Sequence, residues 1–181
     1  MTEDVRIIFT ASPKLSSRII RWFTRSPVSH VYVEYESELW GGRWAAEATK
    51  GGVRKVIAKK SRHDVHAEFR CKFDTKKGLR AVSEFLGEDY DYLGVAFYAI
   101  VVLLRRWFSA KIKNPMYSSK SQFCSEFITR FFQGSDLVET TFWDVEKSSP
   151  GRLYRYCIRD TEDFEFIERA GHGVQGISVG G

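Results

Sequence analysis

The stretch 29–53 reads SHVYVEYESELWGGRWAAEATKGGV and contains two runs typical of strands, each followed by a glycine pair. The first run, residues 30–35, is rich in β-branched and aromatic side chains, and its polar and apolar residues fall on opposite sides of a strand. Both glycine pairs predict turns. We therefore expect strands at 30–35, 44–48 and 53–57 that form an antiparallel meander.

Further elements are predicted on both sides of the meander. Val5, Ile7 and Phe9 recur at every second position, which indicates a short strand. Ser12-Pro13 then announces a helix, because serine caps free amides and proline fits the first helical position. The remaining predicted elements are a strand near 65–73, helices at 75–86 and about 93–108, an amphipathic helix from 123 to 134, and a last strand at 153–158.

Size and composition indicate one globular domain. The chain has 181 residues, of which 43% are hydrophobic and 28% charged, which excludes disordered, collagen-like and disulfide-scaffold classes. We expect a single domain over residues 1–170 and a flexible glycine-rich tail over 171–181.

The charge distribution favours solvent-exposed basic surfaces over the concentrated basic stripe of a nucleic-acid-binding protein. The net charge is only +5, and the sequence pI is about 9.1. Basic side chains gather in two clusters, and the C-terminal stretch from Asp160 to Glu168 is acidic. A lesser hypothesis is that this acidic stretch covers one of the two basic clusters. The clusters consist of Arg54, Lys55, Lys59, Lys60 and Arg62, and of Arg105, Arg106, Lys111 and Lys113.

The N-terminus carries acids where a signal peptide needs positive charge, so we expect no signal peptide and synthesis in the cytoplasm. The apolar run from Leu93 to Leu104 is too short for a membrane-spanning helix of ~20 residues. It fits a buried helix somewhat better than an interfacial one, although the Arg-Trp end at Arg106-Trp107 also suits a membrane surface.

Cysteine usage points to a reducing compartment. The chain has three cysteines and no CxxC pair, so neither a disulfide framework nor a cysteine zinc site is indicated. Cys71 and Cys157 lie in strand-like segments and are expected to be core thiols. His63 and His66 lack further ligands for a metal, and nothing in the sequence demands a metal or organic cofactor.

The residues best suited to chemistry are Cys124, His30 and Glu47. Cys124 lies near the start of a predicted helix, where unpaired amides and the helix dipole favour a thiolate. His30 on one strand would be its base, and Glu47 on the next strand would orient the imidazole. Each of these residue types, taken alone, is more often structural than catalytic.

Five blocks follow one another along the chain: SHVYVEY, EATKGGV, a helix that ends at Gly87, YDYLG and FCSEFI. Their order resembles that of the circularly permuted, YiiX-like branch of the NlpC-type cysteine peptidases. This branch is more distantly similar to lecithin retinol acyltransferase. The resemblance implies a permuted papain-like α+β fold in which a meander packs against the nucleophile's helix. It matches His30, Glu47 and Cys124 to the catalytic triad. Tyr32 and Glu34 are bulkier than the small residues usual after the histidine in such relatives.

The resulting hypothesis is a cysteine hydrolase or acyltransferase that cleaves an amide or ester through a thioester. Backbone amides at the start of the cysteine helix, including that of Cys124, would supply part of the oxyanion hole. The expected substrates are peptide, isopeptide or peptidoglycan-type amides, or lipid esters. A cell-wall role would need lysis, injection or delivery in a particle such as a phage virion.

The alternative is a catalytically silent binding module. In that case the basic and aromatic surface would engage an anionic membrane or, less favoured, a nucleic acid. Since all three residue types of a triad occur in the right order, we prefer the enzyme.

Overall fold

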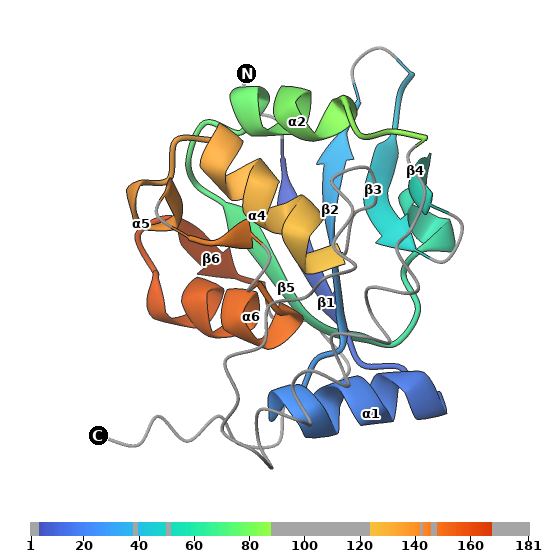
Figure 1. Cartoon of the computed structure of the whole chain (residues 1–181). Helices are drawn as coiled ribbons and strands as arrows, with labels where there is room; N and C mark the ends of the chain where they lie inside the picture. The colour runs from blue at the N-terminus through green and yellow to red at the C-terminus, as the bar shows by residue number, and fades with distance from the viewer. Residues whose placement is uncertain are drawn as a thin grey trace.

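A single antiparallel sheet organises the chain (Figure 1). This is a computed structural model, and it describes residues 4–37, 40–49, 52–87, 124–141, 143–145 and 148–167. The strand order is β4-β3-β2-β1-β5-β6, and every neighbouring pair is antiparallel. The strands are β1 (Arg6–Thr10), β2 (His30–Glu36), β3 (Arg43–Thr49), β4 (Gly52–Ile57), β5 (Val65–Cys71) and β6 (Phe164–Phe166).

The predicted meander is confirmed as β2-β3-β4. Val33 pairs with Ala46 between β2 and β3, and Glu47 pairs with Arg54 between β3 and β4. The strand predicted near 65–73 is also present, as β5, but it pairs with β1. These pairings make β1 and β2 the centre of the sheet.

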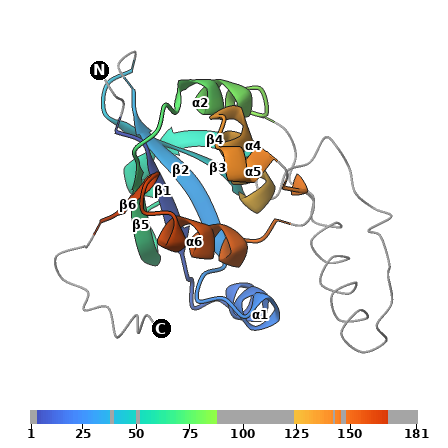
Figure 2. The same cartoon turned by 90° about the vertical axis from the view of Figure 1, so that its left-hand side faces the viewer.

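Three helices cover one face of the sheet, as Figure 2 shows in profile. They are α2 (Lys76–Ser83), α4 (Cys124–Gly134) and α6 (Pro150–Arg159), and the short α5 (Val138–Thr141) follows α4. The main hydrophobic core lies between this face and the helices. Its largest fully buried side chains are Phe9, Phe69, Phe127, Phe131, Phe132, Ile7, Ile128 and Leu153.

Two glycines let α2 and α4 pack closely. A Cβ atom on Gly134 would lie 2.8 Å from Cβ of Ala81, and one on Gly78 would lie 2.5 Å from the carbonyl oxygen of Phe131. Both distances are shorter than a normal carbon contact. The helix that carries Cys124 is therefore held against α2 by backbone contact.

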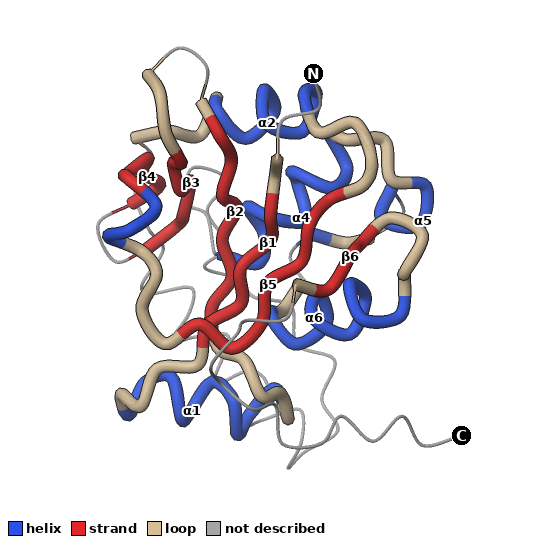
Figure 3. Tube along the Cα trace, turned by 180° about the vertical axis from the view of Figure 1, so that it is seen from behind, coloured by secondary structure: helices blue, strands red, loops and turns tan. Residues whose placement is uncertain are grey.

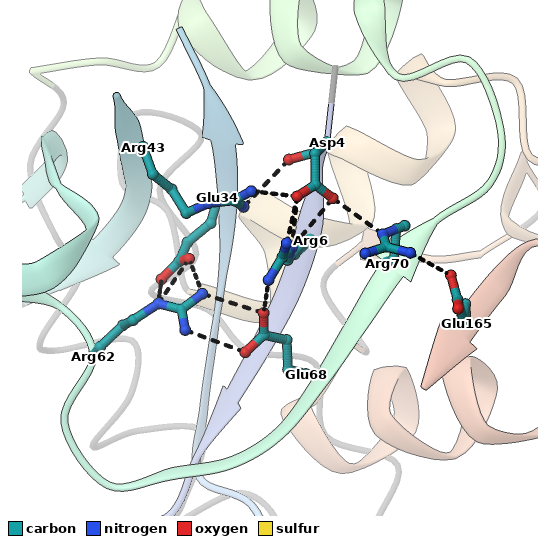
Figure 4. Close-up of polar contacts among 8 residues, drawn as sticks. All are labelled: Asp4, Arg6, Glu34, Arg43, Arg62, Glu68, Arg70 and Glu165. Carbon is teal, nitrogen blue, oxygen red and sulfur yellow. Dashed lines mark hydrogen bonds and ion pairs between the residues drawn. The ribbon is translucent and has the colours of Figure 1, made fainter. Parts of the chain in front are cut away.

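The opposite face of the sheet, seen from behind in Figure 3, carries a network of paired charges beside a small apolar cluster of Ile8, Tyr32, Ala45 and Ala58. There Arg62 binds the buried carboxylates of Glu34 and Glu68, and Arg6 joins Glu68 to Asp4 (Figure 4). Buried charges are tolerated only when they are paired, and these pairs tie β1, β2 and β5 to the loop after the 3-10 helix η1 (Ala58–Lys60).

Helix α1 (Leu15–Thr24) lies beyond the end of the sheet where β1 ends and β2 begins (Figure 1). The predicted capping is only partly right. Lys14, not Ser12, is the N-cap residue, and Pro13 precedes the helix. The hydroxyl of Ser12 instead accepts a hydrogen bond from the Lys14 amide at 3.4 Å.

The strand predicted at 153–158 is wrong, because this segment lies within helix α6. Ser149 caps the helix by accepting a hydrogen bond from the Arg152 amide, and Pro150 occupies the first turn. Cys157 is therefore a helix residue and not a strand residue.

Several predicted features lie outside the described residues: the helix at about 93–108 with Arg105, Arg106 and Trp107, the YDYLG block, and the tail 171–181. Within the described segments, every helix is too short or too polar to cross a bilayer.

Candidate functional site

Strands β2 and β3 bring His30 and Glu47 together. His30 is the first residue of β2, and Glu47 lies towards the end of the antiparallel β3, so both are at the same end of the sheet. Their side chains approach with 3.7 Å between His30 Nε2 and Glu47 Oε2. This distance corresponds to an ion pair rather than a close hydrogen bond. The side chains are 26% and 5% exposed, so the pair is largely shielded from water.

Glu47 is held by two further residues that the sequence reasoning missed. Arg54 donates from Nε and a terminal nitrogen to Oε1 at 2.9 and 2.8 Å, and the Ser61 hydroxyl donates to the same oxygen at 3.0 Å. Burial raises the pKa of Glu47, but the contacts with His30, Arg54 and Ser61 outweigh burial and hold the pKa below its usual value. Glu47 is therefore a carboxylate that presents its second oxygen to His30.

Helix α4 brings Cys124 to the other side of the imidazole. Cys124 is the first residue of α4 and is 7% exposed, and α4 packs on β2 and β3. Its side chain interacts with His30 closely enough to raise the pKa of the imidazole. Because Nε2 of His30 faces Glu47, Nδ1 is the ring nitrogen left for the sulfur. The structure thus brings the three predicted site residues together around one imidazole.

The surroundings of His30 favour its charged form. Burial lowers the pKa of His30, but the interactions with Cys124 and with the Glu47 carboxylate more than offset this and raise it to about 9. A histidine that stays protonated beside a sulfur and a carboxylate is suited to an imidazolium–thiolate pair.

The other two cysteines have a different environment. Cys71 is 8% exposed at the end of β5, and Cys157 is 1% exposed in α6. Burial raises the pKa of both thiols well above its ordinary value. The prediction that both belong to the core is confirmed, and among the described residues no histidine acts on the pKa of either thiol.

Tyr32 and Glu34, the bulky residues after the histidine, have structural partners. The Tyr32 hydroxyl donates to the Ser61 carbonyl at 3.1 Å, and Glu34 binds Arg62; both residues are fully buried. Ser61 thus links Tyr32 to Glu47, so the side chains of Tyr32 and Glu34 fix the loop that supports the acid.

A cavity of about 560 Å³ lies elsewhere, between α2 and the end of β2 opposite His30. It is lined by Tyr35, Ser37, Leu79 and Arg80, among others. Its location separates it from the three candidate residues.

The basic cluster at 54–62 is largely engaged within the protein. Arg54 binds Glu47, Arg62 binds Glu34 and Glu68, and Lys55 Nζ lies 3.6 Å from the centre of the Trp40 ring. The acidic C-terminal stretch does not cover this cluster in the described residues. Its Glu165 binds Arg70 instead.

No group of three or more His, Cys, Asp or Glu side chains is arranged to hold a metal ion within the described segments. His66 packs its ring against Tyr154 at a centroid distance of 5.6 Å. Burial and the charge of Arg21 lower the pKa of His66.

Comparison with known proteins supports the fold. No protein-family profile matches the chain, and no curated protein sequence matches it. A solved structure, that of the metalloprotein yiiX from Escherichia coli O157:H7, a DUF1105 protein, is similar with a TM-score of 0.58 and 16% sequence identity. The match covers 93% of this chain and 97% of that chain. The chain therefore has a YiiX-like fold, a mixed α/β arrangement in which a six-stranded antiparallel sheet packs against helices.

Proposed function

We propose that this protein is a cysteine-dependent hydrolase or acyltransferase with Cys124 as nucleophile, His30 as base and Glu47 as the residue that orients His30. One observation carries the proposal: a single imidazole contacts a helix-start cysteine and a buried, arginine-bound carboxylate. The permuted papain-like relationship implied by the sequence motifs agrees with these roles and remains a prediction.

The first half of the reaction would form a thioester. His30 holds, as an imidazolium, the proton that Cys124 has given up, and the Cys124 thiolate attacks the carbonyl carbon of the substrate. The carbonyl π electrons move to oxygen, to which the Cys124 backbone amide would donate a hydrogen bond. The tetrahedral intermediate then collapses, and the leaving amine or alcohol takes the proton held by His30.

The second half would release the acyl group. His30 removes a proton from water or from an acceptor alcohol or amine, which attacks the thioester carbon. The carbon–sulfur bond breaks, the Cys124 sulfur leaves as the thiolate, and His30 keeps the proton, which restores the starting ion pair. Glu47 remains ionised throughout, because Arg54 and Ser61 hold one oxygen while the other faces His30. Its contribution is to fix the ring and stabilise the imidazolium.

The bond that reacts is an amide or an ester, since a thiolate with a histidine acid–base group suits acyl transfer in general. Peptide, isopeptide, peptidoglycan-type and lipid ester substrates all have the required carbonyl. The acyl-acceptor step decides between hydrolysis and transfer.

The similar yiiX structure is described as a metalloprotein, which raises the question of a metal here. The donor set does not fit one within the described residues, because no cluster of ligating side chains is arranged for it. Arg54 and Ser61 also occupy the Glu47 oxygen that does not face His30. The proposed steps therefore use only protein side chains and the substrate.

Acyl-enzyme trapping tests the proposal. The protein is incubated with a panel of p-nitrophenyl acyl esters and amides, quenched in acid and mapped by mass spectrometry. We expect one acyl adduct, on Cys124, and its loss in Cys124→Ala and His30→Ala. Cys157→Ala is the matched control and should keep the adduct. An adduct distributed over several residues, or one retained in His30→Ala, would contradict the assignment.

A further inference from the structure

Helix α1 presents three large apolar side chains to solvent. Leu15, Ile19 and Trp22 are 70%, 44% and 66% exposed. Their spacing of four and three residues places them on one face of the helix. Soluble monomers seldom expose a continuous apolar stripe, and such stripes mark interaction surfaces.

The opposite face of α1 is the one that contacts the protein. Ser17 is buried, and its hydroxyl lies 2.6 Å from the hydroxyl of Ser29. Ser29 in turn hydrogen-bonds to the carbonyl of Thr10 through its backbone amide and its hydroxyl. The helix is therefore reversed relative to an ordinary surface helix, because the polar Ser17 faces the fold while Leu15, Ile19 and Trp22 are largely exposed.

Basic side chains accompany the exposed stripe. Lys14, Arg18 and Arg25 are exposed. No acidic residue occurs from 11 to 33. A short helix with a tryptophan-containing apolar face and only positive charges beside it has the character of helices that lie in the interface of anionic membranes.

We propose that α1 docks this protein on an anionic lipid bilayer, with Leu15, Ile19 and Trp22 inserted among the headgroups and acyl chains and the basic residues at the level of the phosphates. Charge complementarity selects this occupant over a neutral protein groove, because lysine and arginine near an anionic surface strengthen binding by about fivefold each.

The position of α1 connects docking to the candidate site. Ser17 binds Ser29, which directly precedes His30, and α1 lies at the end of the sheet where β2 starts (Figure 1). A membrane bound to α1 therefore lies at the same end of the sheet as His30. This step rests on the proposed function, and it favours acyl esters of membrane lipids among the candidate substrates.

Vesicle co-sedimentation tests docking without catalysis, with Cys124→Ala as the background. The vesicles are phosphatidylcholine alone or phosphatidylcholine with phosphatidylserine, each at low and high salt. We expect binding to the anionic vesicles, weakened by salt. The triple change Leu15→Ser, Ile19→Ser and Trp22→Ser should reduce partitioning by about tenfold or more, since the inserted apolar area is lost.

Matched variants keep the test specific. Ile57 and Leu86 are 52% and 41% exposed elsewhere, and Ile57→Ser with Leu86→Ser should leave vesicle binding unchanged. For the charges, Lys14→Gln with Arg18→Gln should weaken binding about twentyfold or more, if each charge contributes about fivefold. The exposed pair Lys59→Gln with Lys60→Gln is the control, and circular dichroism checks that each variant is folded.

Two results would overturn the proposal. One is equal binding of the wild type and the α1 triple variant to anionic vesicles. The other is a dimer in solution that the triple variant converts to monomer without any vesicle binding, which would identify a second copy as the occupant. The proposed function fails separately, if the soluble ester panel gives no Cys124 adduct while vesicle binding persists.

Discussion

Arg54 and Glu47 face each other across the β3–β4 pair, and both guanidinium contacts go to a single carboxylate oxygen, Oε1. The other oxygen, Oε2, is the one that faces His30. Arg54 thus holds Glu47 in place through one oxygen while the other oxygen is oriented towards His30. This arrangement lets the carboxylate stabilise an imidazolium without moving.

Replacing Glu47 by Gln should lower the pKa of His30. The carboxylate favours the charged imidazole, so its loss shifts the pKa from about 9 towards the ordinary value. The measurement is an NMR titration of the ring carbons, with the His30 signal identified from His30→Gln. The exposed Glu36 on the same strand supplies the control Glu36→Gln, which should leave the titration unchanged. An unaltered pKa in Glu47→Gln would mean that Glu47 does not act on His30.

Removing the anchors of Glu47 should reduce reactivity while the triad residues stay in place. We expect Arg54→Met and Ser61→Ala each to slow Cys124 acylation by about ten- to a hundredfold, the usual range for residues that orient a site. The exposed Lys59 gives the control Lys59→Met, which removes a positive charge without touching Glu47. If all three variants react at the wild-type rate, the orientation of Glu47 is unimportant.

The polar network on the opposite face should make the fold acid-sensitive. The guanidinium of Arg6 hydrogen-bonds to Asp4, and this contact together with Arg43 holds the Asp4 pKa well below its usual range despite burial. A carboxylate with a depressed folded-state pKa stabilises the protein above its unfolded value of about 3.9, and the stabilisation is lost as the pH falls below that.

Asp4→Asn should therefore cost about 1–3 kcal/mol of unfolding free energy at pH 7 and progressively less below about pH 4. Urea denaturation at a series of pH values measures the difference. The exposed Glu162 provides the comparison Glu162→Gln, which should have little effect at any pH. A cost for Asp4→Asn that does not change with pH would argue against the ion pairs as its origin.

The contact between α2 and α4 should not tolerate a larger residue. Gly134→Ala places a methyl group 2.8 Å from Cβ of Ala81 and should destabilise the fold by about 1–3 kcal/mol. Ala81→Gly in the same chain removes the clashing atom. The double variant should then be more stable than the sum of the two single effects, as a double-mutant cycle measures. Strict additivity would show that the helices are not in contact there.

The sheet could be predicted from local pattern to a large extent. Residues 30–57 combine β-branched and aromatic runs with glycine pairs, so local chemistry alone fixes three strands and their antiparallel order. The prediction of a strand at 153–158 is wrong, because the aromatic and apolar residues of this helical segment also suit a strand. The decisive signal was the Ser149-Pro150 cap just before it.

Long-range features were only partly accessible from the sequence. Motif order predicted His30, Glu47 and Cys124 as partners. The roles of Arg54 and Ser61 depend on strand register and on the loop after η1. The pairing of Arg54 with Glu47 across the short turn was a detectable signal. The orientation of α1 has no such signal in the sequence, because periodicity shows that a helix has an apolar face but not which way that face points.

The central claim is that His30 activates Cys124, and the most direct test is the alkylation rate of each cysteine as a function of pH, followed by mass spectrometry in the wild type and in His30→Ala. The buried Cys71 and Cys157 serve as internal controls. We expect Cys124 to react selectively well below pH 8 and to lose that advantage in His30→Ala. If Cys124 reacts no faster than Cys71 and Cys157, or keeps its rate without His30, the catalytic account is contradicted and a binding module becomes the better description.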